Sequence, residues 1–200
     1  DELGAFKAPV PNLTEQTALV TFLDRETAKI DGLVAEQRRL MELLKEKRQA
    51  VISHAVTQGL NPRAPMKPSG IEWLGDVPAH WDIRRVRWLC EIKKRIAGEL
   101  GYDVLSITQQ GVRIKDLESN DGQLSMDYSK YQFVEVGDFA MNHMDLLTGY
   151  VDLSPVHGVT SPDYRVFTIR DQAICHDKYL LYLLQMGYKN RIFFAYGQGS

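Results

Sequence analysis

Two pairs of neighbouring side chains have the chemistry of metal ligands: His143 with Asp145, and Cys175 with His176. Each pair stands alone, because no further ligand follows at the spacing of a zinc site. The sequence also lacks a glycine-rich phosphate loop, the Asp/Asn-Pro-Pro-aromatic motif of adenine methyltransferases, and the paired carboxylates with a following lysine found in nucleases. We therefore expect this chain to hold no metal ion or cofactor and to carry out no catalysis.

The charge balance bears on whether the chain can bind an acidic partner. The sequence has 24 Lys and Arg against 26 Asp and Glu, a net charge of −2, whereas DNA-binding domains usually show a basic surface. Basic residues nevertheless cluster at 84–87 and at 93–95, and phosphate binding needs a local patch rather than a basic average. Composition alone therefore disfavours nucleic-acid binding without excluding it.

The remaining composition predicts a globular cytoplasmic protein. Hydrophobic residues make up 44% of the chain, which is enough for a packed core. No apolar run approaches the ~18 residues of a membrane span, and the first residues do not have the pattern of a signal peptide. Cys90 and Cys175 are expected to be buried thiols.

A long amphipathic helix is predicted over residues 14–58. The hydroxyl of Thr14 can accept a backbone N–H at its start, and Gly59 and Pro62 end it. At 1.5 Å per residue it would be about 65 Å long. Its apolar residues repeat with a heptad period and need a partner helix, and the polar Gln37 among them can fix the register. This seam consists of Leu23, Ile30, Leu33, Gln37, Leu40, Leu44 and Val51.

The rest of the chain predicts a mixed module. Residues 59–81 are predicted to form a Pro-, Gly- and Trp-rich linker. Its Trp73–Trp81 segment is expected to pack against the domain. Residues 83–96 form either a short helix or a strand that leads into a basic turn. A helix over 177–186 is followed by a second one that begins near Tyr188. Strand-like runs separated by turn residues lie at 104–108, 111–114, 131–134, 138–141, 150–153 and 164–169. The predicted fold class is α+β, with a coiled-coil-type helix and a curved, mainly antiparallel sheet.

Several stretches resemble the specificity subunit of a type I DNA restriction–modification system. The central helical region of that family is similar to PNLTEQTALVTFLDRETAKIDGLVAEQRRLMELLKEKRQAVISHAVTQGL, and the entry to its second target-recognition domain is similar to PSGIEWLGDVPAHW. The core and the end of such a domain resemble VEVGDFAMNHMDLLTGYVDLSPVHGVTSPDYRVF and YLLYLLQMGYKNRIFFAYGQGS. Together these stretches cover most of the chain.

The resemblance implies a DNA-reading subunit without catalysis of its own. Residues 1–13 would be the tail of a preceding recognition domain, 14–58 the spacer helix between two half-sites, 59–81 the linker, and 82–200 a target-recognition domain. The implied partners are double-stranded DNA, the modification (methyltransferase) and restriction subunits, and a second copy paired through the helix. S-adenosylmethionine, ATP and Mg would be bound by the partner subunits.

The order of these segments departs from the family pattern. A recognition domain of the family closes with a strand and a proline-rich segment, which here correspond to residues 6–16 at the start of the chain. Residues 6–10 would then fill a vacant sheet edge of the 82–200 domain, within one chain or from a second copy. The alternative is a truncated domain with an open edge that is prone to aggregation.

A recognition role assigns tasks to particular side chains. Arg and Lys suit guanine, and Asn and Gln suit adenine. The candidates for base contacts are Gln109, Gln110, Arg113, Asn142, His143 and Gln198. The candidates for phosphate contacts are Lys93, Lys94, Arg95, Lys115, Lys178, Lys189 and Arg191. Tyr164 and Tyr196 are candidates for stacking or for hydrogen bonds to the DNA backbone. We expect Lys93–Arg95 to project from a loop and Gln109–Gln110 from a turn.

Ordinary alternatives remain for these residues and for the whole chain. Each candidate could be a surface polar group, and Asn142 and His143 could instead stabilise a turn. The alternative function is a coiled-coil module that docks on methyltransferase subunits and binds little DNA. The salt dependence of DNA binding separates the two functions, because phosphate contacts make affinity fall steeply with salt.

Overall fold

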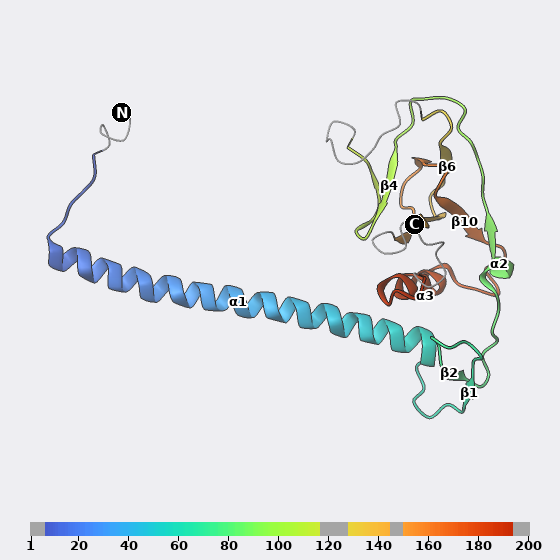
Figure 1. Ribbon diagram of the computed structural model, residues 1–200, viewed down its shortest axis with the longest axis horizontal. Helices are drawn as coiled ribbons and strands as arrows, with labels where there is room; N and C mark the ends of the chain where they lie inside the picture. The colour runs from blue at the N-terminus through green and yellow to red at the C-terminus, as the bar shows by residue number, and fades with distance from the viewer. Residues whose placement is uncertain (1–6, 117–127, 145–149, 194–200) are drawn as a thin grey trace. The chain divides into compact units, whose positions relative to one another are not determined.

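The computed structural model describes residues 7–116, 128–144 and 150–193 and shows a long N-terminal helix followed by a mixed α+β unit (Figure 1). The chain forms two compact units, one up to Gln49 and one from Ala50 onward, and each is considered by itself. All pairs of named strands in the described residues are antiparallel. The predicted α+β class, with a long helix and antiparallel pairing, is confirmed.

Helix α1 spans Leu13–Gln58 and begins one residue earlier than predicted. Asn12, not Thr14, caps it, because its side-chain oxygen accepts the Glu15 N–H at 2.9 Å, which satisfies one of the unpaired donors of the first turn. The end is as predicted, since Gly59 has a φ of 78°, a conformation that glycine adopts without strain.

The last turn of α1 and the linker pack within the second unit. Val56 is buried, and its carbonyl accepts a hydrogen bond from the Tyr179 hydroxyl at 3.3 Å. Trp81 meets the ring of Tyr179 edge to face, with 6.5 Å between the ring centroids. Trp73, by contrast, is 39% exposed, so only the Trp81 end of the linker docks as predicted. The linker also contains a small hairpin, made of β1 (Met66–Pro68) and β2 (Asp76–Pro78).

In the described residues, three sheets and two helices make up the rest of the second unit. The four-stranded sheet has the order β3 (Cys90–Ile92), β10 (Arg165–Ile169), β7 (Phe139–Met141) and β8 (Val151–Leu153). Two-stranded sheets pair β4 (Leu105–Thr108) with β5 (Gly111–Ile114), and β6 (Gln132–Val134) with β9 (Gly158–Thr160). The helices are α2 (Val86–Leu89) and α3 (Asp177–Lys189).

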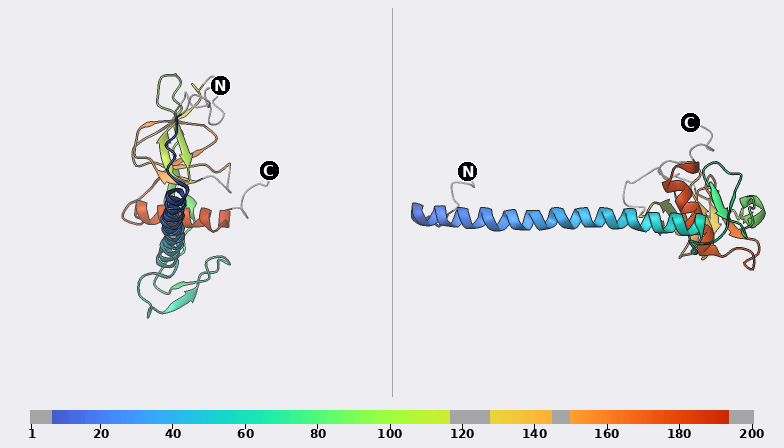
Figure 2. Two further views of the ribbon diagram at one scale, coloured as in Figure 1. Left: turned by 90° about the vertical axis from the view of Figure 1, so that its left-hand side faces the viewer. Right: turned by 90° about the horizontal axis from the view of Figure 1, so that it is seen from below.

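The four-stranded sheet has a hydrophobic core on each face, because successive residues of a strand point to opposite sides. Phe139 and Phe167 stack with 4.9 Å between their centroids and belong to the core that includes Leu180 and Leu184 of α3. Ala140 and Val166, one residue along, belong to the second core with residues of β4, β5 and β6. Figures 1 and 2 show α3 in red against one face of the sheet.

Besides the linker hairpin, the structure differs from the expected elements at three places. Residues 83–96 contain both alternatives, a short helix (α2) and then a strand (β3). Helix α3 continues through Gly187 to Lys189, so the predicted second helix near Tyr188 is part of the first. It continues because Met186 and Tyr188 are both buried. Strand β9 was not predicted.

Replacing Gly158 of β9 by alanine should destabilise the second unit by roughly 1–3 kcal/mol, the usual cost of overpacking a core. An added Cβ would lie 2.6 Å from the Asp103 carbonyl oxygen and 2.8 Å from Leu105 Cγ, so backbone would have to move. Urea denaturation measures the effect. Gly32→Ala is the control, because the Cβ position of this helical glycine is open and its φ is not positive, so it should leave the second unit as stable as in the wild type. A wild-type midpoint for Gly158→Ala would contradict the close approach.

Candidate nucleic-acid interface

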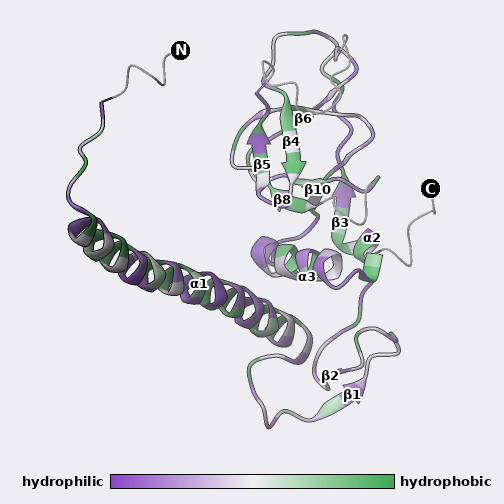
Figure 3. Cartoon of the chain, turned by 60° about the vertical axis from the view of Figure 1, so that its left-hand side comes forward, coloured by the Kyte–Doolittle hydropathy of each residue, from purple (hydrophilic) through white to green (hydrophobic). Residues whose placement is uncertain are grey.

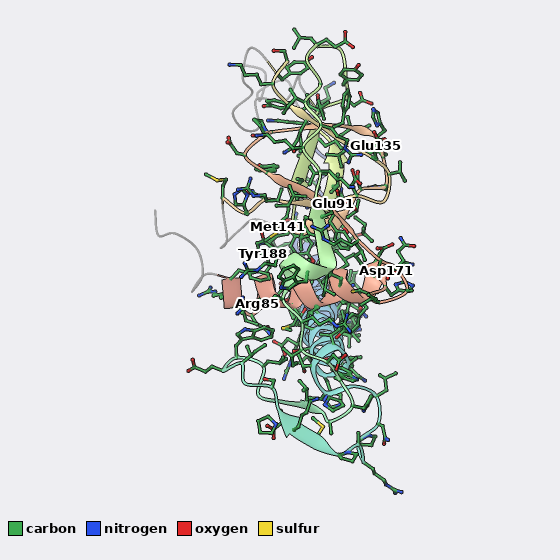
Figure 4. All side chains as sticks on the ribbon, turned by 90° about the vertical axis from the view of Figure 1, so that its right-hand side faces the viewer. Arg85, Glu91, Glu135, Met141, Asp171 and Tyr188 are labelled. Carbon is green, nitrogen blue, oxygen red and sulfur yellow. The ribbon has the colours of Figure 1, made fainter. Side chains whose placement is uncertain are left out.

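The end of strand β7 carries Asn142 and His143, and their backbone is held from two sides. The Asn142 N–H donates to the Tyr150 carbonyl at 2.9 Å, and the Tyr188 hydroxyl donates to the Asn142 carbonyl at 2.6 Å. Met141 and Tyr188, labelled in Figure 4, mark the strand end and the helix that supports it. Asn142 and His143 therefore extend a fixed strand.

The beginning of strand β10 lies beside this strand end, because Met141 pairs with Arg165 in the sheet. A turn over residues 161–164 leads into β10, with the Tyr164 N–H bonded to the Ser161 carbonyl at 3.1 Å. The Asp163 N–H also donates to the Ser161 hydroxyl at 3.2 Å. The sheet thus brings Asn142 and His143 next to a turn about twenty residues further along the chain. We call Asn142, His143, Asp163, Tyr164 and Arg165 the polar end of the sheet.

His143 is in electrostatic contact with the turn. Burial, and next the nearby Arg165 guanidinium, lower the pKa of the His143 imidazole below its ordinary value, and Asp163 partly opposes the shift. Its Nδ1 is buried and has no hydrogen-bond partner among the described residues. The neutral imidazole is therefore favoured at neutral pH, so Arg165 supplies the positive charge at this place.

Arg165 was not among the predicted contacts, although it directly follows Tyr164 in the sequence. Its side chain is exposed, and it forms no ion pair with any carboxylate in the described part of the chain. Tyr164 itself packs half-buried against the second core, which leaves less of its ring for stacking on a base.

The predicted turn between β4 and β5 is present, with Gln109 and Gln110 at its tip and Gly111 at a φ of 100°. The Arg113 guanidinium donates to the side-chain oxygen of Gln110 at 2.8 Å, so the two candidate base-reading groups hold each other. A Cβ on Gly111 would lie 2.5 Å from Asp152 Oδ2. The hairpin tip therefore lies against β8, the strand that also borders the end of β7.

The prediction that Lys93–Arg95 projects from a loop is wrong. The segment instead continues the strand beyond β3. The Lys93 N–H donates to the Val166 carbonyl at 2.8 Å, and the Arg95 carbonyl accepts from the Phe133 N–H at 2.7 Å. The Arg95 side chain forms an ion pair with the buried Asp138, and Lys93 pairs with Glu91 at 2.7 Å. Of these three cations only Lys94 is both exposed and without an ion pair among the described residues.

The basic residues of α3 lie at its two ends. Lys189 ends the helix and directly follows Tyr188, whose hydroxyl donates to the Asn142 carbonyl. Arg191 lies two residues further on, with a φ of 56°. Lys178 lies in the first turn, beside Tyr179 and the end of α1, so it does not belong to the polar end. Lys115 follows β5 at the far end of the hairpin from its tip. Tyr196, Gln198 and Asp145 lie outside the described residues.

The two cysteines are buried free thiols. Burial, and then the proximity of Cys175, raises the pKa of the Cys90 thiol to about 11, and burial raises that of Cys175. The neighbouring His176 caps α3, accepting the Lys178 N–H at 3.1 Å. In the ranges that the structure describes, no three His, Cys, Asp or Glu side chains come together as metal ligands would.

The predicted seam of α1 is exposed. Val56 is the buried residue of the helix, whereas Leu33, Leu40, Leu44 and Val51 are between 49% and 61% exposed. Apolar residues are interspersed along α1 in Figure 3, where green marks the hydrophobic positions. Monomeric proteins rarely leave so long an apolar row in water. The predicted pairing of α1 with a second helix would cover this seam.

None of the helices in the described residues combines the length and apolarity needed to cross a membrane. Comparison of the chain with protein-family models, and with curated proteins, finds no match.

Proposed function

We propose that this chain is a sequence-specific DNA recognition subunit that directs type I modification and restriction subunits to a split target site. The observation that carries the proposal is the polar end of the sheet, where Asn142 and His143, directly after β7, lie beside Arg165 at the start of β10. Amide and guanidinium groups held on a rigid scaffold are the groups that read base edges and phosphates. The resemblance of the sequence to specificity subunits points to the same function.

Each part of the chain has a role in this proposal. Helix α1 would pair with a second copy as an antiparallel coiled coil and set the spacing between two half-sites. The four-stranded sheet would curve around the DNA, with the hairpin tip at Gln109–Gln110 and the polar end facing the grooves. The chain would act in the cytoplasm without catalysis of its own, and S-adenosylmethionine, ATP and Mg would serve the partner subunits.

The exposed seam also favours a second candidate function, a coiled-coil module that docks on methyltransferase subunits and binds little DNA. Both candidates need the helix, and only the first needs the polar end. DNA binding by the full chain therefore separates them.

Fluorescence anisotropy with a labelled duplex of mixed sequence, repeated over a range of salt concentrations, tests the proposal. Recognition predicts that the logarithm of affinity falls linearly with the logarithm of salt, by about 0.9 for each phosphate contact. The matched control is an acidic peptide that contains no tryptophan and carries the same charge as the duplex. Added as a competitor, this peptide should not displace the duplex. An absence of binding at low salt would contradict DNA recognition and leave the docking module.

A further inference from the structure

The carboxamide of Gln132 is a buried polar group with a specific use. Gln132 lies in β6, is only 3% exposed, and its Nε2 donates to the Ser161 carbonyl at 3.0 Å and to the Tyr164 carbonyl at 2.9 Å. Both hydrogen bonds end on the turn that leads into β10. Since a buried amide that loses its partners is destabilised, the amide and the turn fix each other's position.

The turn that Gln132 fixes sets the start of β10. Tyr164 is the last residue of the turn, and the next residue, Arg165, pairs with Met141 of β7. Arg165 and Asp163 are also the two charged groups that act on His143. A shift of the Tyr164 carbonyl would therefore move Arg165 relative to His143, with no change in either side chain.

We propose that Gln132 is a positioning residue for DNA recognition, and that it acts by holding the 161–164 turn so that Arg165 contacts the DNA backbone beside His143. The inference rests on the proposed DNA-binding function and adds Arg165 as the contact and Gln132 as its support. A surface-exposed arginine without an ion pair in the described residues breaks no ion pair there when it meets a phosphate.

A structural explanation must be separated from this one, because the buried amide also stabilises the fold. Thr160 provides the matched control. It is fully buried, lies opposite Gln132 in the β6–β9 pair, and its hydroxyl donates to the Leu105 carbonyl at 3.3 Å. Thr160→Val removes a buried hydrogen bond from the same two-stranded sheet and leaves the turn untouched.

The test is a double-mutant cycle on DNA affinity with the full chain and a labelled duplex of mixed sequence. Arg165→Ala should weaken binding about tenfold at low salt and reduce the salt slope by up to about 0.9, the value of one phosphate contact. Gln132→Met, which keeps the size and removes the donors, should reproduce most of both changes. The double variant should bind like the single variants, because coupled residues are not additive.

The controls keep the inference falsifiable. All variants are compared at a temperature where circular dichroism shows them folded, and Ser161→Ala, which loosens the same turn from its exposed side, serves if Gln132→Met does not fold. Thr160→Val should keep the wild-type salt slope. If Arg165→Ala binds like the wild type, or if Gln132→Met (or Ser161→Ala in its place) matches Thr160→Val, the inference is wrong. If the wild type shows no salt-dependent binding, the proposed function fails instead.

Discussion

Replacing Leu33 and Leu40 of α1 by glutamate should convert the protein from a dimer into a monomer. These two side chains are 61% and 49% exposed in the single chain, and each should be covered in a helix pair. Burying a leucine contributes roughly 1.5–3 kcal/mol, so the four leucines of two copies contribute several kcal/mol, and four like charges would then repel across the seam. The helical signal should also fall, because long helices in water depend on tertiary packing.

Sedimentation velocity at micromolar concentration, together with circular dichroism, measures both effects. The matched control is Ala28→Glu with Ala35→Glu, which adds the same charges about half a turn away from the seam and should leave the dimer intact. A wild-type protein that sediments as a monomer would show that the seam does not pair copies of this chain. Equal dissociation of the two variants would show that added charge, rather than the seam, controls association.

Replacing Asp138 by alanine should destabilise the second unit, and by more than Gly158→Ala does. The carboxylate is 5% exposed, pairs with Arg95, and accepts the Glu135 N–H at 2.8 Å. Removing one partner of a buried ion pair costs about 3–5 kcal/mol. We expect a loss of roughly 2–4 kcal/mol here, because the Arg95 side chain is 35% exposed and water can solvate it in the variant.

Urea denaturation of the variant measures this loss. Asp138→Asn keeps an acceptor for the Glu135 N–H and should lose less stability than Asp138→Ala. Lys94→Ala is the functional contrast, since Lys94 is exposed: it should keep the wild-type stability and reduce the salt slope of DNA binding. Wild-type stability of Asp138→Ala would mean that the Arg95–Asp138 pair is not structural, and Arg95 would return to the list of phosphate contacts.

The sequence predicts best the features that depend on neighbouring residues. Helix α1 follows from its heptad period and from Gly59, and only its first residue was misplaced, because Asn12 competes with Thr14 as a cap. The turn at Gln109–Gln110 follows from Gly111, which takes a positive φ. In both cases, the residues within and next to the element are enough to predict it.

Long-range pairing explains what the sequence could not predict. Strand β9 has no alternating pattern and is a strand because β6 pairs with it. Arg95 looks like a phosphate contact until Asp138, 43 residues away, is seen beside it. Arg165 became a candidate only because the pairing of β7 with β10 places it beside His143. Distances between residues far apart in the chain decide which polar groups remain available to a ligand.

Selection of bound duplexes from a random-sequence DNA library tests the central proposal most directly. A recognition subunit whose two copies pair through an antiparallel α1 should enrich one short half-site, repeated in inverted orientation at a fixed spacing. The Arg165→Ala variant, selected in parallel, should enrich the same spacing with weaker retention, since α1 is unchanged. A wild-type pool that remains random after repeated rounds would contradict sequence-specific DNA recognition by this chain.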